Sequence, residues 1–414
     1  MQSIIIFIIT LGLFSYFLVY LNKRFSAGLH WKWLLLGYFS KILLGCLYGY
    51  IYLHYYGGDD TWYFNKGGAE EFELLRTDPV GFFKPFNPIA AFERYEGWGK
   101  NWYYYLVDLE WSFITKPLGL FHVVSGGNYY INAVLFNFIQ IWSALIFLKW
   151  VRKRFQVQGP WPFLLLCFFP PIAFWLSGIR GDGYLFLCMM LVINAFDSLL
   201  TQFKKRSLCY LALGIVGVLI FRQQIMVLLA PALLVWYLVV RKNRLIGRTA
   251  VWVYGTLIAL FILSSFLPPS YSIPLKIASL QNSYRQLHGK TILPLGQLDG
   301  SWVTYIKVLP QAFSNSFLRP FPWEAKGALQ LFFSGSHLLF WVLLLFAVFR
   351  YPHQLLSLAK SPAIGSLLIF SVSLYLIIGF TVPYPGAIVR YIVPGMVFFY
   401  LWIGLAMFRP RNTN

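Results

Sequence analysis

Charged residues, and acidic residues above all, are scarce in this chain of 414 residues. Only 12% of the residues are charged, 14 are Asp or Glu, and 58% are hydrophobic. The mean hydropathy is +0.63, and a chain with so few polar side chains cannot cover itself with a water-soluble surface. The composition therefore excludes a soluble globular protein and indicates that a lipid bilayer solvates the chain.

Cysteine is also rare, and the motifs of several enzyme classes are absent. The sequence holds no phosphate-binding glycine-rich loop, no serine-hydrolase elbow and no zinc-binding spacing. The four cysteines lie in or beside apolar runs without metal-ligand spacing: Cys46, Cys167, Cys188 and Cys209. No metal site or cofactor is therefore specified, and only a divalent cation, Mg²⁺ or Mn²⁺, held by paired aspartates stays open.

Long apolar runs recur from one end of the sequence to the other. We expect an all-α fold, a polytopic transmembrane helical bundle of about eleven spans that forms one transmembrane domain over 1–414. The predicted spans lie at 3–21, 34–56, 129–151, 160–177, 184–200, 207–221, 225–240, 249–267, 329–349, 364–381 and 388–407.

The net charge of +20 comes from basic clusters that alternate with these runs. By the positive-inside rule, we expect the clusters to face the cytoplasm of a bacterial cytoplasmic (inner) membrane, with the N-terminus outside and the C-terminus inside. Their partners are then anionic membrane lipids rather than nucleic acid. The clusters are Lys23 and Arg24, 152–154, 204–206, 241–248, Arg350 with Lys360, and Arg409 with Arg411.

Two long connections, 57–128 and 268–328, belong to the opposite, outer set. They are rich in aromatic residues, so we expect amphipathic helices that lie on the membrane surface. In the first loop, the spacing of apolar residues predicts a helix from Trp62 that ends before Pro79. The charges within 102–122 favour an interfacial helix over a span.

Two adjacent carboxylates, Asp59 and Asp60, follow the second predicted span and the pair Gly57 and Gly58. Like charges side by side at a low-dielectric boundary are costly unless a ligand or a proton neutralises one of them. One carboxylate can then accept a proton near neutral pH, while the glycines let a ligand approach the backbone. Asp59 and Asp60 are therefore candidate catalytic residues. The alternative is a turn in which an aspartate caps the following helix.

A second signal is a tight outer turn that holds Arg180 and Asp182 between two predicted spans. A guanidinium group can bind a phosphate through two parallel hydrogen bonds, with Asp182 orienting it. Both residues are therefore candidates for substrate binding. The alternative is an arginine at the membrane boundary that pairs with a neighbouring acid.

Other cations lie at the outer boundary, where positive-inside bias alone would leave few. They are Arg222, Arg319 and Arg390, the last of which precedes Tyr391. Their position indicates either a lipid-linked phosphate or pyrophosphate as ligand, or ion pairs with outer acids. We include Arg222, Arg319, Arg390 and Tyr391 among the candidate substrate-binding residues.

Trp323 and Glu324 follow Arg319 on a segment stiffened by two prolines. An aromatic face beside a carboxylate suits a sugar, which stacks on the ring and donates hydrogen bonds to the acid. Trp323 and Glu324 complete the candidate substrate-binding set.

Together these features resemble the GT-C class of integral-membrane glycosyltransferases. That class carries an acidic motif in its first long outer loop, beside amphipathic surface helices; Asp59 and Asp60 match the motif and 57–128 matches the loop. Arg390 and Tyr391 are similar to phosphate-contacting positions near the C-terminal end of such enzymes. The resemblance implies a polyprenyl-phosphate-linked sugar donor, and a glycan or lipid acceptor, on the periplasmic or extracellular face.

The resemblance covers most of the chain in architecture but only these few residues in motif. It also has one departure, because the acidic motif follows the second predicted span here, whereas the class usually places it after the first. An added N-terminal span would account for the difference.

Two other functions stay open from the sequence. The turn at Arg180 and the segment from Arg319 to Glu324 are also similar to bacterial polysaccharide-assembly membrane proteins, including O-antigen or exopolysaccharide polymerases and ligases. Those act on lipid-pyrophosphate glycans, and their outer arginines would matter more than an acidic pair. The third function is a lipid-linked glycan flippase or transporter, which the large outer loops disfavour.

Overall fold

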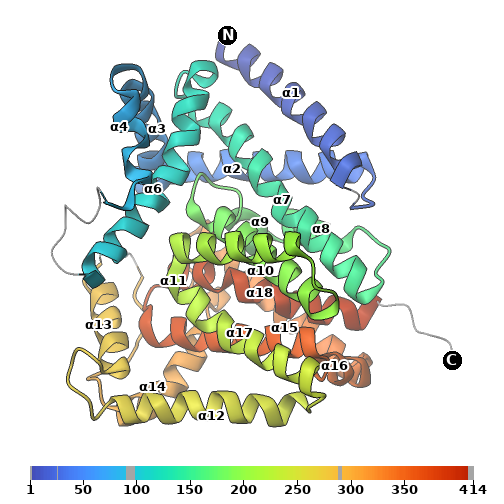
Figure 1. Ribbon diagram of the computed structural model, residues 1–414, viewed down its shortest axis with the longest axis vertical. Helices are drawn as coiled ribbons and strands as arrows, with labels where there is room; N and C mark the ends of the chain where they lie inside the picture. The colour runs from blue at the N-terminus through green and yellow to red at the C-terminus, as the bar shows by residue number, and fades with distance from the viewer. Residues whose placement is uncertain (1, 26, 90–97, 288–290, 409–414) are drawn as a thin grey trace. The chain divides into compact units, whose positions relative to one another are not determined.

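The computed structural model describes residues 2–25, 27–89, 98–287 and 291–408. Every regular element in these ranges is a helix, which confirms the all-α prediction (Figure 1). The basic residues Arg409 and Arg411 lie outside the described ranges. The elements are α1 (Gln2–Phe25), α2 (Trp31–Tyr56), α3 (Asp60–Thr77), α4 (Pro79–Phe83), η1 (Lys84–Phe86), α6 (Trp98–Ser125), α7 (Tyr129–Phe155), α8 (Trp161–Phe168), α9 (Pro170–Trp175), α10 (Gly181–Thr201), α11 (Lys205–Lys242), α12 (Ile246–Ser264), α13 (Ile273–Arg285), α14 (Trp302–Phe313), η2 (Ser314–Leu318), η3 (Pro322–Glu324), α15 (Ala328–Arg350), α16 (Pro352–Ala359), α17 (Pro362–Thr381) and α18 (Pro385–Phe408).

Nine helices of the described ranges are long and apolar enough to cross a bilayer: α1, α2, α7, α10, α11, α12, α15, α17 and α18. The chain is therefore a polytopic helical membrane protein, although the count of about eleven spans is not confirmed. The predicted span 160–177 forms two short helices that break before Pro170, because a proline disfavours helical geometry in the residue before it. The predicted spans 207–221 and 225–240 correspond to the two parts of α11, which meet at a kink where Arg222 has non-helical angles (φ −160°, ψ 94°).

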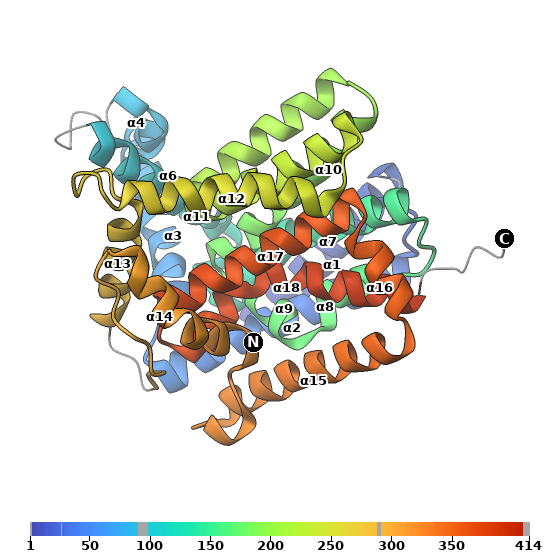
Figure 2. The same ribbon diagram turned by 90° about the horizontal axis from the view of Figure 1, so that it is seen from below.

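The single transmembrane domain that the sequence predicts divides into two compact units, Met1–Met226 and Val227–Asn414. In the first unit α7 is the central helix, packed against α1, α2, α8 and α10 (Figure 1). In the second unit α17 and α18 pack side by side, with α12 beside α17 and α15 beside α18 (Figure 2).

The two ends of α7 have opposite character. At its C-terminal end, Arg152 donates a hydrogen bond to the carbonyl of Ala27 at 2.6 Å, so two of the basic clusters lie together. At its N-terminal end, Tyr129 stacks on Trp62 of the loop 57–128, with ring centroids 4.5 Å apart. A rise of about 1.5 Å per residue separates these ends by roughly 35 Å, enough to cross a hydrocarbon core of about 30 Å. Two of the basic clusters and the loop 57–128 thus lie at opposite ends of α7.

The loop 57–128 contains α3, which ends at Thr77 as predicted, and α6, which is not among the candidate spans. The two helices pack closely, since a Cβ atom added at Gly68 would lie 2.6 Å from the Cβ of Leu118. Between them Lys116 Nζ lies 2.6 Å from Glu71 Oε2, with side chains only 4% and 10% exposed. A buried ion pair therefore joins the helices that follow the Asp59–Asp60 turn.

Candidate functional site

The adjacent carboxylates lie at a sharp change of chain direction at the end of α2. The helix ends at Tyr56, and Gly57 and Gly58 follow with φ values of 70° and 92°. The N–H of Gly58 donates to the carbonyl of Tyr52 at 2.9 Å. Because residues with a Cβ atom rarely adopt such angles, the two glycines allow the chain to turn and begin α3 at Asp60.

Arg180, the residue before α10, binds both carboxylates. Its Nη1 donates to Asp59 Oδ2 and its Nη2 to Asp60 Oδ2, and each N···O distance is 2.6 Å. Nη1 also donates to the phenolic oxygen of Tyr48 at 2.6 Å. The Arg180 side chain is only 2% exposed, whereas those of Asp59 and Asp60 are 32% and 61% exposed. The guanidinium therefore lies buried beneath the two carboxylates, which form the accessible face of the site.

Asp59 occupies the N-cap position of α3 but does not cap it with its side chain. No hydrogen bond joins its carboxylate to a backbone N–H of the helix, and Oδ2 accepts from Arg180 instead. A hydrogen bond between two charged groups is roughly twice as strong as one between neutral groups, which explains the preference for the guanidinium. The capping turn that the sequence left open as an alternative is therefore not formed by Asp59.

Buried polar side chains from two spans hold the turn that carries Arg180. The backbone carbonyls of 176–178 accept hydrogen bonds from Lys41 of α2 and from Asn137 and Gln140 of α7. The N···O distances are 2.5, 3.0 and 3.2 Å, in that order. Because an unpaired carbonyl inside a membrane protein costs several kcal/mol, these bonds stabilise the non-helical turn and position Arg180.

Tyr48 is the innermost of three stacked tyrosines on α2. The rings of Tyr48 and Tyr52 are 4.4 Å apart at 18°, and those of Tyr52 and Tyr56 are 5.1 Å apart at 29°. Tyr48 is fully buried, while Tyr56 is 46% exposed. The stack therefore leads from the Arg180 guanidinium to the surface beside the acidic turn.

Asp182 joins a second arginine to the cluster. Its Oδ1 accepts from Arg222 Nη2 at 3.3 Å, and its Oδ2 lies 3.8 Å from Arg180 Nε. The carboxylate of Glu110, on α6, is also near, since a Cβ atom added at Gly181 would lie 2.7 Å from Glu110 Oε1. The site therefore contains more carboxyl groups than guanidinium groups.

The charge of Arg180 is secured by these neighbours. Burial alone lowers the pKa of a guanidinium, because it penalises the charged form. The surrounding oxygen atoms outweigh this effect and raise the pKa of Arg180 well above its usual value; they belong to Tyr48, Asp182, Asp59 and Asp60. Arg180 therefore stays cationic.

The pairing limits what the site can bind. Arg180 and Arg222 are both engaged by carboxylates, an arrangement that suits the orientation of an acid better than direct binding of a phosphate. Accessible carboxylates can accept a proton or contribute oxygen ligands to a cation. Within the described residues, no three or more His, Cys, Asp or Glu side chains are grouped to hold a metal ion.

In the second unit, Arg319, Trp323 and Glu324 share one loop. Arg319 Nε lies 3.2 Å from Glu324 Oε1, and the N–H of Phe321 donates to Glu324 Oε2 at 3.3 Å. Trp323 is 78% exposed and stacks on Phe321, with ring centroids 4.7 Å apart and an interplanar angle of 10°. The loop therefore presents an open aromatic face, while Arg319 makes the ion pair that the sequence left open.

Arg390 and Tyr391 lie near the start of α18, also in the second unit. The Arg390 guanidinium is 5.3 Å from the centroid of the Tyr391 ring, which is 6.1 Å from the ring of Tyr284 on α13. Both residues are partly buried. The candidates thus fall into two sets, with Asp59, Asp60, Arg180, Asp182 and Arg222 in the first unit and Arg319, Trp323, Glu324, Arg390 and Tyr391 in the second.

Tyr48 and Lys41 belong to the first cluster but are not among the candidates chosen from the sequence. A lysine in the middle of an apolar run is a strong functional signal in a membrane protein, and Lys41 fits that rule. Tyr48, Tyr52 and Tyr56 recur at helical spacing directly before the acidic pair, which could have placed them on one face.

Comparisons of the chain with protein-family models, with curated proteins and with solved structures find no match. Its function is therefore argued from the geometry and chemistry of the site.

Proposed function

We propose that this protein is a membrane glycosyltransferase that moves a sugar from a polyprenyl-phosphate-linked donor to a glycan or lipid acceptor. The observation that carries the proposal is the accessible pair Asp59 and Asp60 held by the buried Arg180. A carboxylate that is fixed by hydrogen bonds and open on one side can accept the proton of an acceptor hydroxyl. Asp59 and Asp60 follow the end of a candidate span, which supports a position at headgroup depth, where a lipid-linked phosphate lies.

Asp60 is the general base in this proposal. Its side chain is 61% exposed, and in the described structure only its Oδ2 is bonded, to Arg180. The acceptor oxygen forms a bond to the anomeric carbon while the bond from that carbon to the phosphate oxygen breaks. The hydroxyl proton passes to Asp60, and the electron pair leaves with the polyprenyl phosphate. Arg180 is a positioning residue that orients both carboxylates.

We also propose that the protein lies in a bacterial cytoplasmic membrane with its N-terminus outside and its C-terminus in the cytoplasm. Basic residues gather at the C-terminal end of α7, which supports a cytoplasmic location for that end. Asp59 and Asp60 then lie at the periplasmic or extracellular face.

The rival function, a polymerase or ligase of lipid-pyrophosphate glycans, depends on arginines that bind the pyrophosphate. Arg180, Arg222 and Arg319 are each paired with a carboxylate, which favours the acid-centred mechanism. Arg390, Tyr391 and Trp323 stay predicted substrate-binding residues. The role proposed for Asp60 does not depend on them.

The test is a transfer assay with the full chain reconstituted in lipid. Radiolabelled sugars are supplied on polyprenyl monophosphate or on polyprenyl pyrophosphate, with a glycan and lipid acceptor extract, with and without EDTA. The proposal expects a new glycosidic bond from the monophosphate donor. Transfer from the pyrophosphate donor alone supports the rival, and movement of label into sealed vesicles without any new bond supports a transporter. Loss of transfer with EDTA, restored by Mg²⁺ or Mn²⁺, would add a divalent cation to the mechanism.

A further inference from the structure

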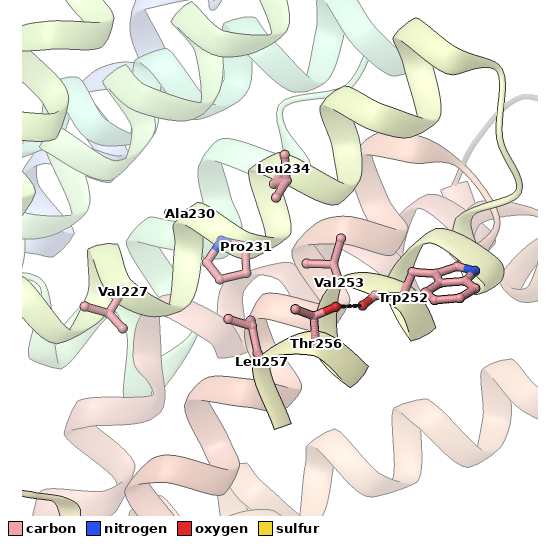
Figure 3. A pocket seen from close by; sticks show the side chains of 8 residues that line it. All are labelled: Val227, Ala230, Pro231, Leu234, Trp252, Val253, Thr256 and Leu257. Carbon is pink, nitrogen blue, oxygen red and sulfur yellow. Dashed lines mark hydrogen bonds between the residues drawn. The ribbon is translucent and has the colours of Figure 1, made fainter. Parts of the chain in front are cut away.

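An apolar groove of about 550 Å³ lies between the last part of α11 and α12, within the second unit (Figure 3). Its one hydroxyl side chain, Thr256, donates to the carbonyl of Trp252 at 2.9 Å, and apart from this hydroxyl and the indole N–H of Trp252 the lining side chains are hydrocarbon. The groove therefore suits a hydrocarbon chain. The residues used below are Ala230, Pro231 and Leu234 from α11, and Trp252, Thr256 and Leu257 from α12.

The helix that forms one wall of the groove is apolar on almost every side. Val251, Trp252 and Leu263 of α12 are 73%, 66% and 61% exposed within the chain. The helix meets the length and hydropathy required of a membrane span, so these side chains face lipid. A groove beside such a helix opens to the bilayer and is accessible to acyl chains.

A cationic connection joins α11 to α12 beyond one end of the groove. Lys242, Arg244 and Arg248 lie in or beside the short link between α11 and α12, and all three are exposed. At a helical rise of about 1.5 Å per residue, Leu234 lies roughly 12 Å from Lys242, and Trp252 about 6 Å from Arg248. Both distances fit within one leaflet, whose hydrocarbon depth is about 15 Å.

These cations have no acidic neighbour in the sequence. No Asp or Glu occurs between Asp197 and Asp299. In the described part of the chain, no ion pair joins Lys242, Arg244 or Arg248 to a carboxylate. Exposed cations at a membrane boundary attract anionic headgroups, and basic pockets between transmembrane helices hold them.

We infer that the groove between α11 and α12 is a binding site for one anionic phospholipid. An acyl chain lies along Pro231, Leu234 and Thr256, and the phosphate is held by Arg244 and Arg248. In the proposed topology this end faces the cytoplasm, which favours a phospholipid of the inner leaflet over an outward-facing polyprenyl phosphate. The site is independent of sugar transfer.

The test is native mass spectrometry of the delipidated full chain with added phosphatidylglycerol, phosphatidylcholine or polyprenyl phosphate. We expect one phosphatidylglycerol to be retained at least about tenfold more than phosphatidylcholine at equal concentration. The double variant Arg244→Ala, Arg248→Ala removes the headgroup contacts, and Thr256→Trp fills the groove; each should reduce retention of phosphatidylglycerol to the level of phosphatidylcholine. The control, Lys276→Ala with Lys307→Ala, removes two exposed cations of α13 and α14, which follow the opposite end of α12, and should retain the lipid.

Equal retention of the two phospholipids, or full retention by both site variants, would overturn the inference. Stronger retention of polyprenyl phosphate than of phosphatidylglycerol would also overturn it, because the occupant would then be the donor lipid. Each variant is first checked for a single symmetric elution peak and near-normal thermal unfolding. If Thr256→Trp fails that check, Ala230→Phe fills the same groove from the opposite helix and gives the same readout.

Discussion

The guanidinium of Arg180 and the phenol of Tyr48 meet inside the first unit, with Nη1 2.6 Å from the phenolic oxygen. Both side chains are almost completely buried. Tyr48 belongs to α2 and Arg180 immediately precedes α10, so this contact joins the helix that ends at the acidic pair to the turn that orients it. The positions of Asp59 and Asp60 therefore depend on two spans rather than on their own loop.

Removing the phenolic oxygen should loosen this contact without removing the ring stack. We expect Tyr48→Phe to lower the free energy of unfolding by about 1 kcal/mol, because Nη1 keeps its bond to Asp59, and also to slow sugar transfer. Thermal unfolding in detergent and the transfer assay measure the two effects. Tyr38→Phe is the matched control: Tyr38 is equally buried on α2 and donates to the carbonyl of Val134 at 2.9 Å. Tyr38→Phe should lower the free energy of unfolding by a similar amount and keep full transfer activity. Equal activity in the two variants would contradict the role given to Tyr48.

Arg180→Lys should keep the positive charge but lose the hydrogen bonds that the planar guanidinium makes to both carboxylates. A lysine ammonium lacks the planar fork that reaches both carboxylates and the phenol, so the acidic pair should be misplaced. We expect transfer to fall by about 100-fold, the scale of a misplacement of roughly 1 Å. Arg154→Lys is the control, since Arg154 lies 3.9 Å from Asp197 in the same unit and away from the acidic turn. A rate for Arg180→Lys within a factor of about two of the control would rule out a positioning role.

Gly58 should be required for its backbone angle rather than for its small size. Nothing lies within 4 Å of a Cβ atom added there, but its φ of 92° strains any residue that carries one. We expect Gly58→Ala to lower the free energy of unfolding by about 1 kcal/mol or more and to reduce transfer. Gly12→Ala, in the middle of α1 with equally open space, should be neutral or slightly stabilising. The same melting temperature for both variants would show that the turn does not need glycine.

Glu71 and Glu70 are neighbours on α3 with opposite environments. Glu71 pairs with Lys116 at 2.6 Å in a buried contact, whereas Glu70 lies 3.9 Å from Lys66 with both side chains mostly exposed. Glu71→Gln leaves a buried ammonium without its counter-ion, so we expect a loss of about 3 kcal/mol. Glu70→Gln should cost less than about 1 kcal/mol. Similar unfolding temperatures for the two variants would contradict the view that the buried pair holds α3 against α6.

The sequence predicted the membrane-spanning helices well because length and hydropathy alone decide them. It also predicted an interruption at 222–224, where Arg222 is non-helical. It did not predict the break before Pro170, because the apolar pattern continues across that change in backbone geometry. The surface helix from the acidic turn to Thr77 could be predicted because its capping and breaking residues are local signals.

The residues of the site could be chosen from the sequence, but their pairing could not. Asp59 and Arg180 are 121 positions apart, and only the packing of α2 against α7, with the turn pinned by Lys41, brings them into contact. The sequence left two partners open for Arg180, a phosphate or a neighbouring acid, and it could not show that Asp59 and Asp60 lie beside the guanidinium. Tyr48 was not selected because its contact with Arg180 cannot be seen in the sequence, where it looks like one more aromatic residue of a span.

The central claim is that Asp60 accepts the acceptor proton while Arg180 holds it in place. The most direct measurement compares transfer rates of Asp59→Asn, Asp60→Asn and Glu70→Gln in the reconstituted assay with a polyprenyl-monophosphate donor. An asparagine oxygen can still accept from Arg180, and the Asp60 side chain is mostly exposed, so the variants should stay folded. We expect Asp60→Asn to lose at least about 100-fold in rate, the scale of a lost general base, and Glu70→Gln to keep full activity. Full activity in both Asp59→Asn and Asp60→Asn, with normal folding, would contradict the account.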